Sequence, residues 1–284
     1  MTRDELAWQS KLVLLLTLPV AGTDVVLQTQ RWATQEPAVA MWTLGLSGLL
    51  GLVTWKLRAA TPGAAAAGFL ITANLMFSTA GEPYTPWRTA LVPVLAVSLL
   101  AFAATRVGRN RKAQLGTAED HKGRRAAQIA ANLGMAVLVS NDAAQAWLDN
   151  SRWSEQLAMA ALAALAGAAA DTVSSEIGQV LGGQPRMLTT LRAAEPGTDG
   201  AISLAGTLAG VVAAAITAGL GVFALRGNLT MLWVSCAGGV FGLFFDSLLG
   251  ATFERAGWLN NDAVNFLSTA SAAAIALGLM VLVR

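Results

Sequence analysis

Long apolar segments separated by short polar ones make up most of the chain. A helix needs about 20 mostly apolar residues to cross the roughly 30 Å hydrocarbon layer of a membrane. Nine segments meet or approach this length: residues 11–29, 39–56, 63–80, 89–105, 126–141, 155–172, 201–222, 229–250 and 263–283. The pattern predicts an all-α fold, a polytopic transmembrane helical bundle of about nine spans. Since the sequence has no long hydrophilic region, we expect residues 1–284 to form a single integral membrane domain.

The basic residues indicate how the predicted spans are oriented. With the N-terminus in the cytoplasm, 14 of the 19 Lys and Arg residues fall on cytoplasmic segments. Such an excess is what the positive-inside rule requires. We therefore expect a multi-pass membrane protein with a cytoplasmic N-terminus.

Composition agrees with this fold and excludes several kinds of site. Charged residues make up 13% of the chain and the mean hydropathy is +0.54, whereas soluble domains carry about 25% charged residues. A single cysteine, Cys236, excludes a disulfide framework within the chain. A single histidine, His121, excludes a two-histidine metal site. We expect the protein to contact membrane lipids and to bind no nucleic acid.

Acidic residues close to the ends of two predicted spans are the strongest functional signal. Asp171 and Glu176 lie near the end of one span, and Asp246 lies near the end of another. Ionisable groups at membrane depth are costly, so they mark functional sites. At about 100° per residue, Asp171 and Glu176 point about 140° apart on a helix. Either the helix unwinds near Ser174, or the two acids have different roles.

The segment that follows these two acids predicts a phosphate-binding loop. Residues 182–185 contain two glycines and a proline that end the helix. Arg186, Arg192 and the glycine-rich turn at residues 196–200 come next. Glycines in such a turn let backbone N–H groups approach an anion closely. Acids, arginines and this turn together suit a magnesium-bound phosphate, although an ordinary re-entry loop would show the same spacing.

Polar stripes enter two further spans from the predicted cytoplasmic side. Arg125, Gln128 and Asn132 share one face of the fifth span, and Asn261 and Asn265 share one face of the ninth. A single stripe of this kind also suits a helix–helix contact. Because all of them reach the same leaflet, they favour one shared polar site at the cytoplasmic face.

Together these motifs resemble a known family. The motifs are residues 122–125 with Gln128 and Asn132, residues 170–178, residues 197–207, and residues 246–251 with Asn265. In this order they are similar to the integral membrane family called domain of unknown function 92, which includes transmembrane protein 19 and the plant phytyl-phosphate kinase. The resemblance covers about residues 40–284. The family is distantly similar to CTP-dependent dolichol kinases and phosphatidate cytidylyltransferases.

What the resemblance implies is a CTP-dependent prenyl monophosphate kinase, of phytyl or geranylgeranyl type, acting at the cytoplasmic membrane face. Its partners would be the prenyl-phosphate lipid and CTP, with Mg²⁺ as cofactor. Because Mg²⁺ prefers one or two carboxylates together with phosphate oxygens, we expect Asp171, Glu176 and Asp246 to be catalytic and metal-binding. The residues expected to bind substrate or nucleotide are Lys122, Arg124, Arg125, Gln128, Asn132, Ser175, Arg186, Arg192, Gly197, Thr198, Ser203, Ser247, Asn261 and Asn265.

Two other functions stay open at this point. A membrane transporter with a polar intramembrane site would hold its acids near the middle of its spans and show an inverted repeat. A CTP-dependent cytidylyltransferase would release pyrophosphate where the kinase releases CDP.

Overall fold

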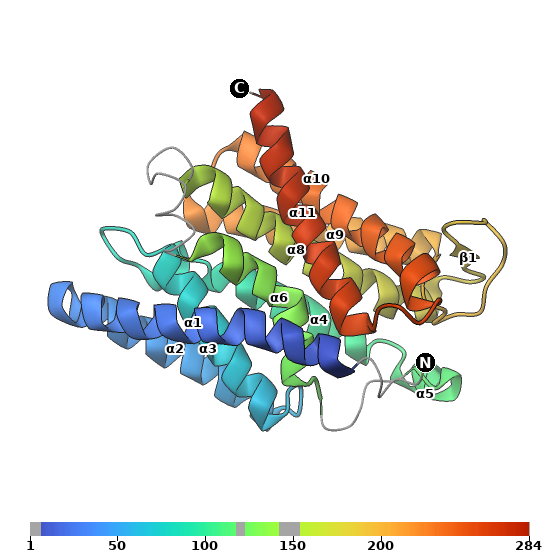
Figure 1. Cartoon of the computed structure of the whole chain (residues 1–284), viewed down its shortest axis with the longest axis horizontal. Coiled ribbons are helices and arrows are strands. Elements are labelled where there is room, and N and C mark those ends of the chain that lie inside the picture. The colour runs from blue at the N-terminus through green and yellow to red at the C-terminus, as the bar shows by residue number, and fades with distance from the viewer. Residues whose placement is uncertain (1–6, 118–122, 142–153, 284) are drawn as a thin grey trace.

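The computed structural model describes residues 7–117, 123–141 and 154–283, which form a helical bundle (Figure 1). Its longer helices are α1 (Ala7–Gln35), α2 (Pro37–Lys56), α3 (Pro62–Ser78), α4 (Leu91–Arg106), α6 (Ala126–Ser140), α8 (Ser154–Leu181), α9 (Leu204–Leu225), α10 (Leu229–Leu249) and α11 (Asn261–Val283). Each coincides with one predicted apolar segment, so the all-α membrane bundle is confirmed. The shorter elements are η1 (Pro86–Arg88), α5 (Arg109–Leu115), the strands β1 (Arg186–Met187) and β2 (Ala201–Ile202), and the π-helical turn η2 (Gly250–Glu254).

The predicted number of nine spans is not confirmed. By length and composition, six of the described helices can cross a membrane, and a seventh span results if α4 and α5, which meet at a 68° bend, are counted as one. Helices α3 and α6 are apolar but have only 17 and 15 residues. They rise about 25 and 22 Å, which is short of the roughly 30 Å hydrocarbon layer. The cytoplasmic orientation of the N-terminus stays a prediction.

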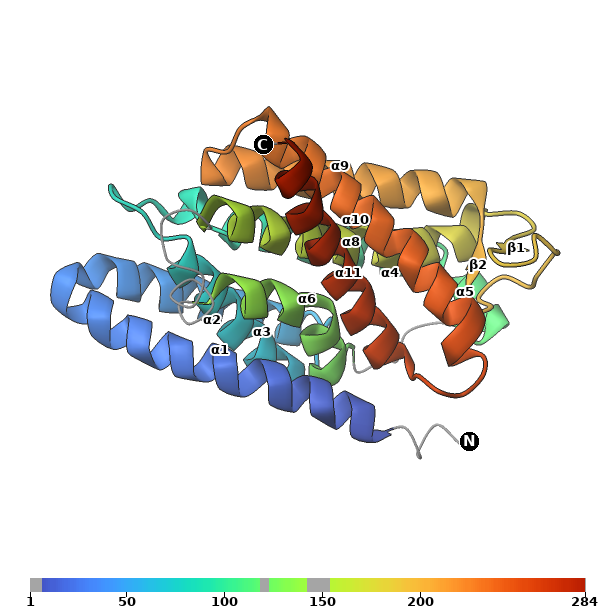
Figure 2. The same ribbon diagram turned by 45° about the horizontal axis from the view of Figure 1, so that its top comes forward.

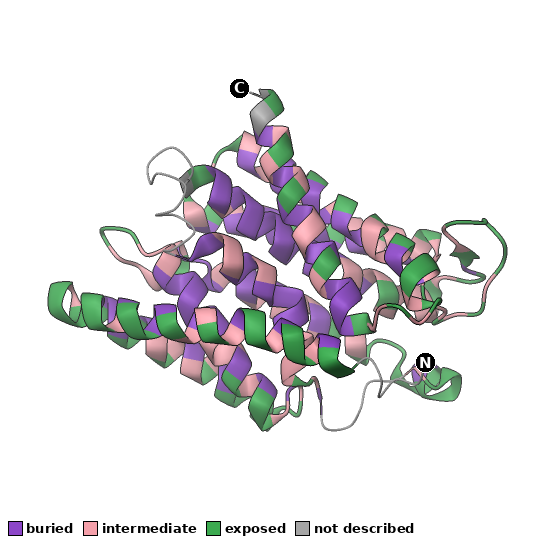
Figure 3. Cartoon of the chain, viewed as in Figure 1, coloured by how far each residue is buried: buried purple, intermediate pink, exposed green. Residues whose placement is uncertain are grey.

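Helix α8 is the centre of the bundle. In the most apolar 18-residue stretch of α8, 83% is buried inside the protein. The corresponding share is 28–39% in the five other helices that are long enough to span a membrane. It packs against α4, α6, α9, α10 and α11, and Figure 3 contrasts its buried surface with the exposed outer face of α1. The alanine-rich sequence of α8 explains this position, because small side chains let neighbouring helices approach closely.

Glycines bring α9 and α10 close to α8. A Cβ atom on Gly210 of α9 would lie 2.8 Å from the carbonyl oxygen of Ala170, and one on Gly239 of α10 would lie 3.0 Å from the amide nitrogen of Gly167. These distances leave no room for a side chain. The three helices therefore form a tight group around the segment of α8 that precedes Asp171.

The first helix joins the bundle although the resemblance begins only at about residue 40. Asp24, a charged residue in the middle of α1, is buried and accepts a hydrogen bond of 2.5 Å from Asn74 of α3. At the start of α1, Ser10 donates a hydrogen bond to Asp262 at the beginning of α11. Because its buried charge has a partner, α1 runs unbroken through Asp24.

A small two-stranded sheet lies at the same end of the bundle as α5 (Figure 2). Strands β1 and β2 are antiparallel. The sequence predicts a loop where β1 lies, and it predicts the start of the span over residues 201–222 where β2 lies. Gly200 has φ +75°, and a Cβ atom there would lie 2.1 Å from the amide nitrogen of Ala251 in η2. The hairpin is therefore held tightly against the end of α10. Because residues 201–202 pair as a strand, α9 begins at Leu204 and not at residue 201.

Candidate functional site

Two cavities lie side by side at this end of the bundle. The first, which we call the polar cavity, has a volume of about 380 Å³ and is lined by α6, α8, α10, α11 and residues 196–203. The second, which we call the apolar pocket, has a volume of about 300 Å³ and lies between α2, α3, α4, α6 and α8. Arg124, Asn132 and Thr172 line both of them, so the two cavities adjoin.

A pair of carboxyl groups lines the polar cavity. Asp171 of α8 and Asp246 of α10 are close enough to interact directly, and the Ser268 hydroxyl of α11 also interacts with Asp246. The Oδ2 atom of Asp246 is buried and has no hydrogen-bond partner in the described part of the chain. Two carboxylates this close repel each other unless a proton or a cation lies between them. The pair is therefore suited to a cation whose other ligands come from a bound anion.

Glu176 has a different partner from Asp171. Its Oε2 atom forms an ion pair of 2.5 Å with Nζ of Lys112, which also donates to the carbonyls of Ala104 and Thr105 at 2.8 and 3.2 Å. Lys112 is only 1% exposed, so this ion pair is largely desolvated. It lies between the two cavities, because Lys112 lines the apolar pocket and Glu176 lines the polar cavity.

Helix α8 does not unwind near Ser174. It continues past the predicted apolar span, which ends at residue 172, and stops at Leu181, directly before residues 182–185, whose glycines and proline are predicted to end it. Of the two alternatives left by the sequence, the structure therefore has the one in which Asp171 and Glu176 point to different partners from one continuous helix. The extension also places Asp171 about three turns before the helix ends. This last part of α8 carries the polar residues Ser175, Glu176 and Gln179, which line the polar cavity. The helix therefore continues beyond its apolar segment.

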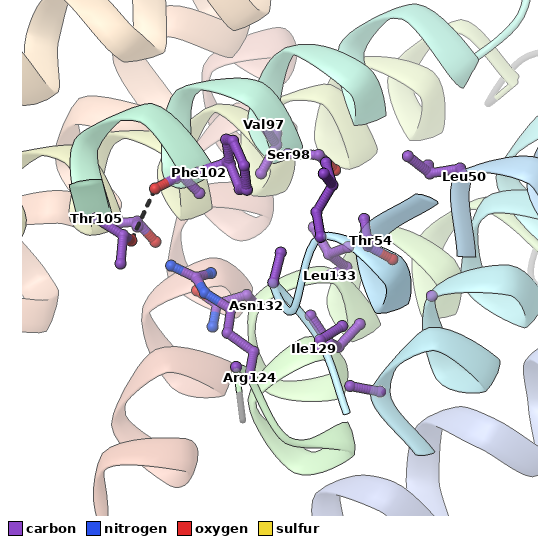
Figure 4. A pocket seen from close by; sticks show the side chains of 18 of the residues that line it. Leu50, Thr54, Val97, Ser98, Phe102, Thr105, Arg124, Ile129, Asn132 and Leu133 are labelled. Atoms are coloured by element: carbon purple, nitrogen blue, oxygen red, sulfur yellow. Dashed lines mark hydrogen bonds between the residues drawn. The ribbon is translucent and has the colours of Figure 1, made fainter. Parts of the chain in front are cut away.

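Arg124 reaches both cavities from the segment before α6. Its backbone N–H donates to the carbonyl of Ala59, and its own carbonyl accepts from Thr61, each at 3.0 Å. Gly123 has φ +78°, and a Cβ atom there would lie 2.5 Å from the carbonyl carbon of Ala59. Glycine is the residue that tolerates both the conformation and the contact. The Arg124 guanidinium extends beside Asn132 (Figure 4) and acts electrostatically on Asp171.

The polar cavity is acidic. Among the described residues, those lining it include five carboxylates and one guanidinium, that of Arg124. The carboxylates belong to Asp171, Glu176, Asp199, Asp246 and Glu254. Such an excess of negative charge repels a bare phosphate and attracts a divalent cation. The cavity therefore favours a cation–phosphate complex over a free anion.

The glycine-rich turn forms one wall of the polar cavity, and its glycines allow close packing there. Gly197 has φ +88°, and a Cβ atom on it would lie 2.6 Å from Cγ2 of Thr117. Gly200 meets η2 in the same way. The N–H of Thr198 donates to the carbonyl of Glu195 at 3.2 Å. Packing thus accounts for both glycines, and the binding of an anion by this turn stays a prediction.

Most of the predicted site residues line the polar cavity. Besides the three acids, they are Arg124, Gln128, Asn132, Ser175, Gly197, Thr198, Ser203, Ser247, Asn261 and Asn265. Two of them also cap helices: Gln128 accepts the N–H of Arg125 at 2.7 Å at the start of α6, and Ser203 accepts that of Gly206 at 3.1 Å at the start of α9. The fold brings these residues together from five stretches of sequence, while their roles in binding stay predictions.

Four predicted residues do not join this group. Arg125, Arg186 and Arg192 are exposed and line neither cavity. Arg186 instead donates to the carbonyl of Leu191 at 2.9 Å within its own hairpin. The pairing of β1 with β2, which the sequence pattern does not reveal, thus keeps both hairpin arginines away from the acids. Lys122 lies outside the described residues.

The apolar pocket gathers basic residues whose positions in the sequence indicate only membrane orientation. They are Arg58, Arg106, Arg109 and Lys112, together with Arg124, and no Asp or Glu is among the described residues that line this pocket. A signal for two of them was present, because positions 109 and 112 are three apart and share one side of a helix. Their closeness to Arg58 and Arg124 depends on the tertiary structure.

The three predicted metal ligands do not form one metal site. In the described ranges, no group of three or more His, Cys, Asp or Glu side chains lies close enough together to hold a metal ion, and Lys112 engages Glu176. Mg²⁺ needs only one or two carboxylates when phosphate oxygens complete its coordination. The Asp171–Asp246 pair fits that requirement, and the unpartnered Oδ2 of Asp246 is the atom best placed to serve.

Comparison with known proteins identifies the family. A family model described as "Integral membrane protein DUF92" matches residues 45–273. An uncharacterised membrane protein of Methanocaldococcus jannaschii is 45% identical over 38% of this chain and 45% of its own length. An uncharacterised membrane protein of Synechocystis is 32% identical over 68% of this chain and 74% of its own length.

A plant protein is similar over a longer part of the chain. Protein VTE6, chloroplastic, of Arabidopsis thaliana is 28% identical over 81% of this chain and 61% of its own length. The chain thus matches less than half of the Methanocaldococcus protein and about three fifths of VTE6. No solved structure matches the chain.

Proposed function

The chain belongs to the DUF92 family of integral membrane proteins, and from this premise we propose that it is a CTP-dependent prenyl monophosphate kinase. The proposed acceptor is a phytyl- or geranylgeranyl-type monophosphate, and the product is the prenyl diphosphate. The reaction takes place in the polar cavity, at the membrane face that the positive-inside rule assigns to the cytoplasm. Kinase chemistry and CTP come from the resemblance to a family that includes phytyl-phosphate kinase.

The observation that carries this proposal is the Asp171–Asp246 pair with its unpartnered Oδ2 atom, in an acidic cavity that adjoins a basic one. A phosphoryl donor is bound as a complex with a divalent cation, which suits the acidic cavity. The acceptor is a phosphate monoester without such a cation, which suits the basic residues of the apolar pocket. The shared residues Arg124, Asn132 and Thr172 lie where the two substrates would meet.

Little acid–base chemistry is required of the protein. A phosphate monoester is mostly dianionic at neutral pH because its second pKa is about 6. One of its oxygens attacks the γ-phosphorus of CTP, the new P–O bond forms, and the bond from that phosphorus to the β–γ bridging oxygen breaks with CDP as leaving group. Phosphoryl transfer depends mainly on positioning and on neutralising charge. This is consistent with a cavity whose lining includes no histidine among the described residues.

The proposed roles follow from position. Asp171 and Asp246 hold Mg²⁺, which when bound neutralises the donor phosphates. The Arg124 guanidinium binds phosphate oxygens between the two substrates, because its planar donors match that geometry. Glu176 acts as a positioning residue by fixing Lys112. Asn132 and Asn265 are both nearly buried in the wall of the polar cavity, and they orient the substrates.

The test is a donor screen on the purified full-length chain in detergent. Phytyl or geranylgeranyl monophosphate, Mg²⁺ and each of the four nucleoside triphosphates are combined, and the lipid and nucleotide products are measured by mass spectrometry. We expect prenyl diphosphate and CDP, with CTP the preferred donor. Release of pyrophosphate with a CDP-linked lipid would instead establish a cytidylyltransferase. If folded protein turned over no donor, the kinase proposal would be wrong, and substrate flux in liposomes would test the transporter.

A further inference from the structure

Most of the hydrocarbon walls of the apolar pocket come from four of the helices that line it. Figure 4 shows Leu50 and Thr54 of α2, Val97 and Phe102 of α4, and Leu133 of α6 around the empty space. The walls continue along α3 through Ala64, Gly68 and Thr72. At about 300 Å³, the pocket is at the lower end of the range of ligand sites, roughly 300–1,000 Å³. Its size suits one hydrocarbon chain better than two.

One end of this pocket is strongly basic. Arg58, Arg106 and Arg109 are exposed around it, and the half-buried Arg124 lies at the border with the polar cavity. Arg106 is also stacked over the Phe102 ring, 3.4 Å from its centroid. No Asp or Glu is among the described residues that line this pocket, and Glu176 at its border is paired with Lys112. The described lining therefore carries a net positive charge. Apolar walls with a basic rim are complementary to a lipid with an anionic headgroup.

The pocket also borders the lipid-facing surface. Helix α2 packs on α1 and α3, and α4 packs on α8 and α9, but α2 and α4 make no extensive contact with each other. Both helices line the pocket, and both carry an exposed leucine next in sequence to a lining residue, Leu52 after Gly51 on α2 and Leu99 after Ser98 on α4. The few contacts between α2 and α4 make the space between them the expected route for a lipid chain from the bilayer into the pocket.

We propose that the apolar pocket binds a single-chain lipid monophosphate, with its hydrocarbon chain between α2, α3, α4 and α6 and its phosphate among Arg58, Arg106, Arg109 and Arg124. This inference rests on the proposed function only for the lipid's fate as phosphoryl acceptor. Binding itself follows from the pocket. Arg124 lies at the end of the pocket that opens toward Asp171, so the bound phosphate faces the polar cavity.

The two ends of the pocket contribute different things. A chain that leaves the bilayer for the pocket exchanges one apolar environment for another, so its burial adds little affinity. The arginines supply the affinity through charge-assisted hydrogen bonds. The walls limit the length and number of chains. We therefore expect phytyl monophosphate to bind, phytol to bind poorly, and two-chain phosphatidic acid to be excluded.

A matched pair of glycine substitutions tests this placement. Gly68 lines the pocket, and a Cβ atom on it would meet nothing within 4 Å, so Gly68→Phe fills the pocket with little strain on the backbone. Gly48 of α2 is equally unobstructed and lines neither cavity, so Gly48→Phe is the control. Binding of radiolabelled phytyl monophosphate and of the shorter geranyl monophosphate is measured on full-length protein, with EDTA present and no nucleotide.

We expect Gly68→Phe to weaken phytyl monophosphate binding by about tenfold or more, geranyl monophosphate binding by less, and Gly48→Phe to match the wild type. The proposal would be overturned if a folded Gly68→Phe protein bound phytyl monophosphate as the wild type does. It would also be overturned if phosphatidic acid displaced the radiolabelled probe as effectively as unlabelled phytyl monophosphate does. Ser98→Phe, from the opposite wall, replaces Gly68→Phe should the latter not fold. Binding with the expected pattern but no turnover would refute the kinase alone, and turnover with no effect of either pocket substitution would refute the pocket alone.

Discussion

The polar cavity and the apolar pocket adjoin each other and carry opposite charge. Among the described lining residues, the polar cavity has five carboxylates and one guanidinium, whereas the apolar pocket has five basic side chains and no acid. Arg124 is the charged residue that lines both. The two cavities also differ in their walls, which are polar in the first and hydrocarbon in the second.

Under the proposed function, this difference lets one membrane protein bring two anions together. Two phosphates repel each other, and a single basic site for both would bind either of them in either position. A site that requires a cation–phosphate complex beside one that accepts a bare phosphate sorts the two by charge. The Lys112–Glu176 ion pair lies between them and keeps the acidic and basic linings apart.

The largest effect is expected from the acidic side. Asp246→Asn removes one charge of the carboxyl pair and should lower kcat by about 10³-fold, because charge stabilisation in phosphoryl transfer is lost. Binding of phytyl monophosphate in EDTA should stay at the wild-type level. Glu195→Gln is the control, since Glu195 is an exposed carboxylate that lines neither cavity. Steady-state kinetics that showed equal losses for both variants would remove the pair from the mechanism.

Arg124 should give the next largest effect, and on both cavities at once. Arg124→Gln is expected to lower kcat/KM by about 10²-fold and to weaken binding of the lipid monophosphate in EDTA. Its neighbour Arg125 is exposed and lines neither cavity, so Arg125→Gln should change either quantity by less than about twofold. A loss confined to kcat, with lipid binding intact, would mean that Arg124 serves the polar cavity only.

Removal of divalent cations should have a smaller effect, and it should affect ligand binding in the polar cavity but not in the apolar pocket. EDTA is expected to weaken CTP binding by about tenfold, because an acidic cavity repels the uncomplexed nucleotide. Phytyl monophosphate binding should be unchanged, because its partners are guanidinium groups. Isothermal titration of the purified protein with each ligand, with and without EDTA, measures both. Metal-dependent binding of the lipid monophosphate would contradict the assignment of its phosphate to the basic rim.

The sequence was sufficient for the helices and for most of the polar cavity. Apolar runs longer than a soluble helix requires show where the membrane helices are, and costly acids such as Asp171 and Asp246 stand out against them. That Asp171 and Asp246 lie at the same end of the bundle could also be predicted, because alternate helices of an antiparallel bundle end on the same side. The sequence left open how far Asp171 lies from the end of its helix. The last part of α8, up to Leu181, is polar and does not resemble a membrane-spanning segment.

The partners of individual charges could not be predicted. Glu176 and Lys112 are 64 positions apart, and their ion pair depends on the bend between α4 and α5. Arg186 and Arg192 looked equivalent to Arg124 as phosphate ligands, yet a two-residue strand pairing holds them outside. Such short strands have no hydrophobic alternation to reveal them. The apolar pocket was missed for a similar reason, because its walls read as ordinary membrane helix.

Gly123 also limits how this sequence can change over evolutionary time. The contact of residues 58–60 with residues 123–124 leaves no volume for a side chain at position 123. A lineage that acquired one would have to separate these two segments, and Arg124, which follows Gly123, would be displaced with its segment. Substitution at position 123 and a change in the length of the turn between α2 and α3 are therefore expected to arise together or to be absent together among descendants of this protein.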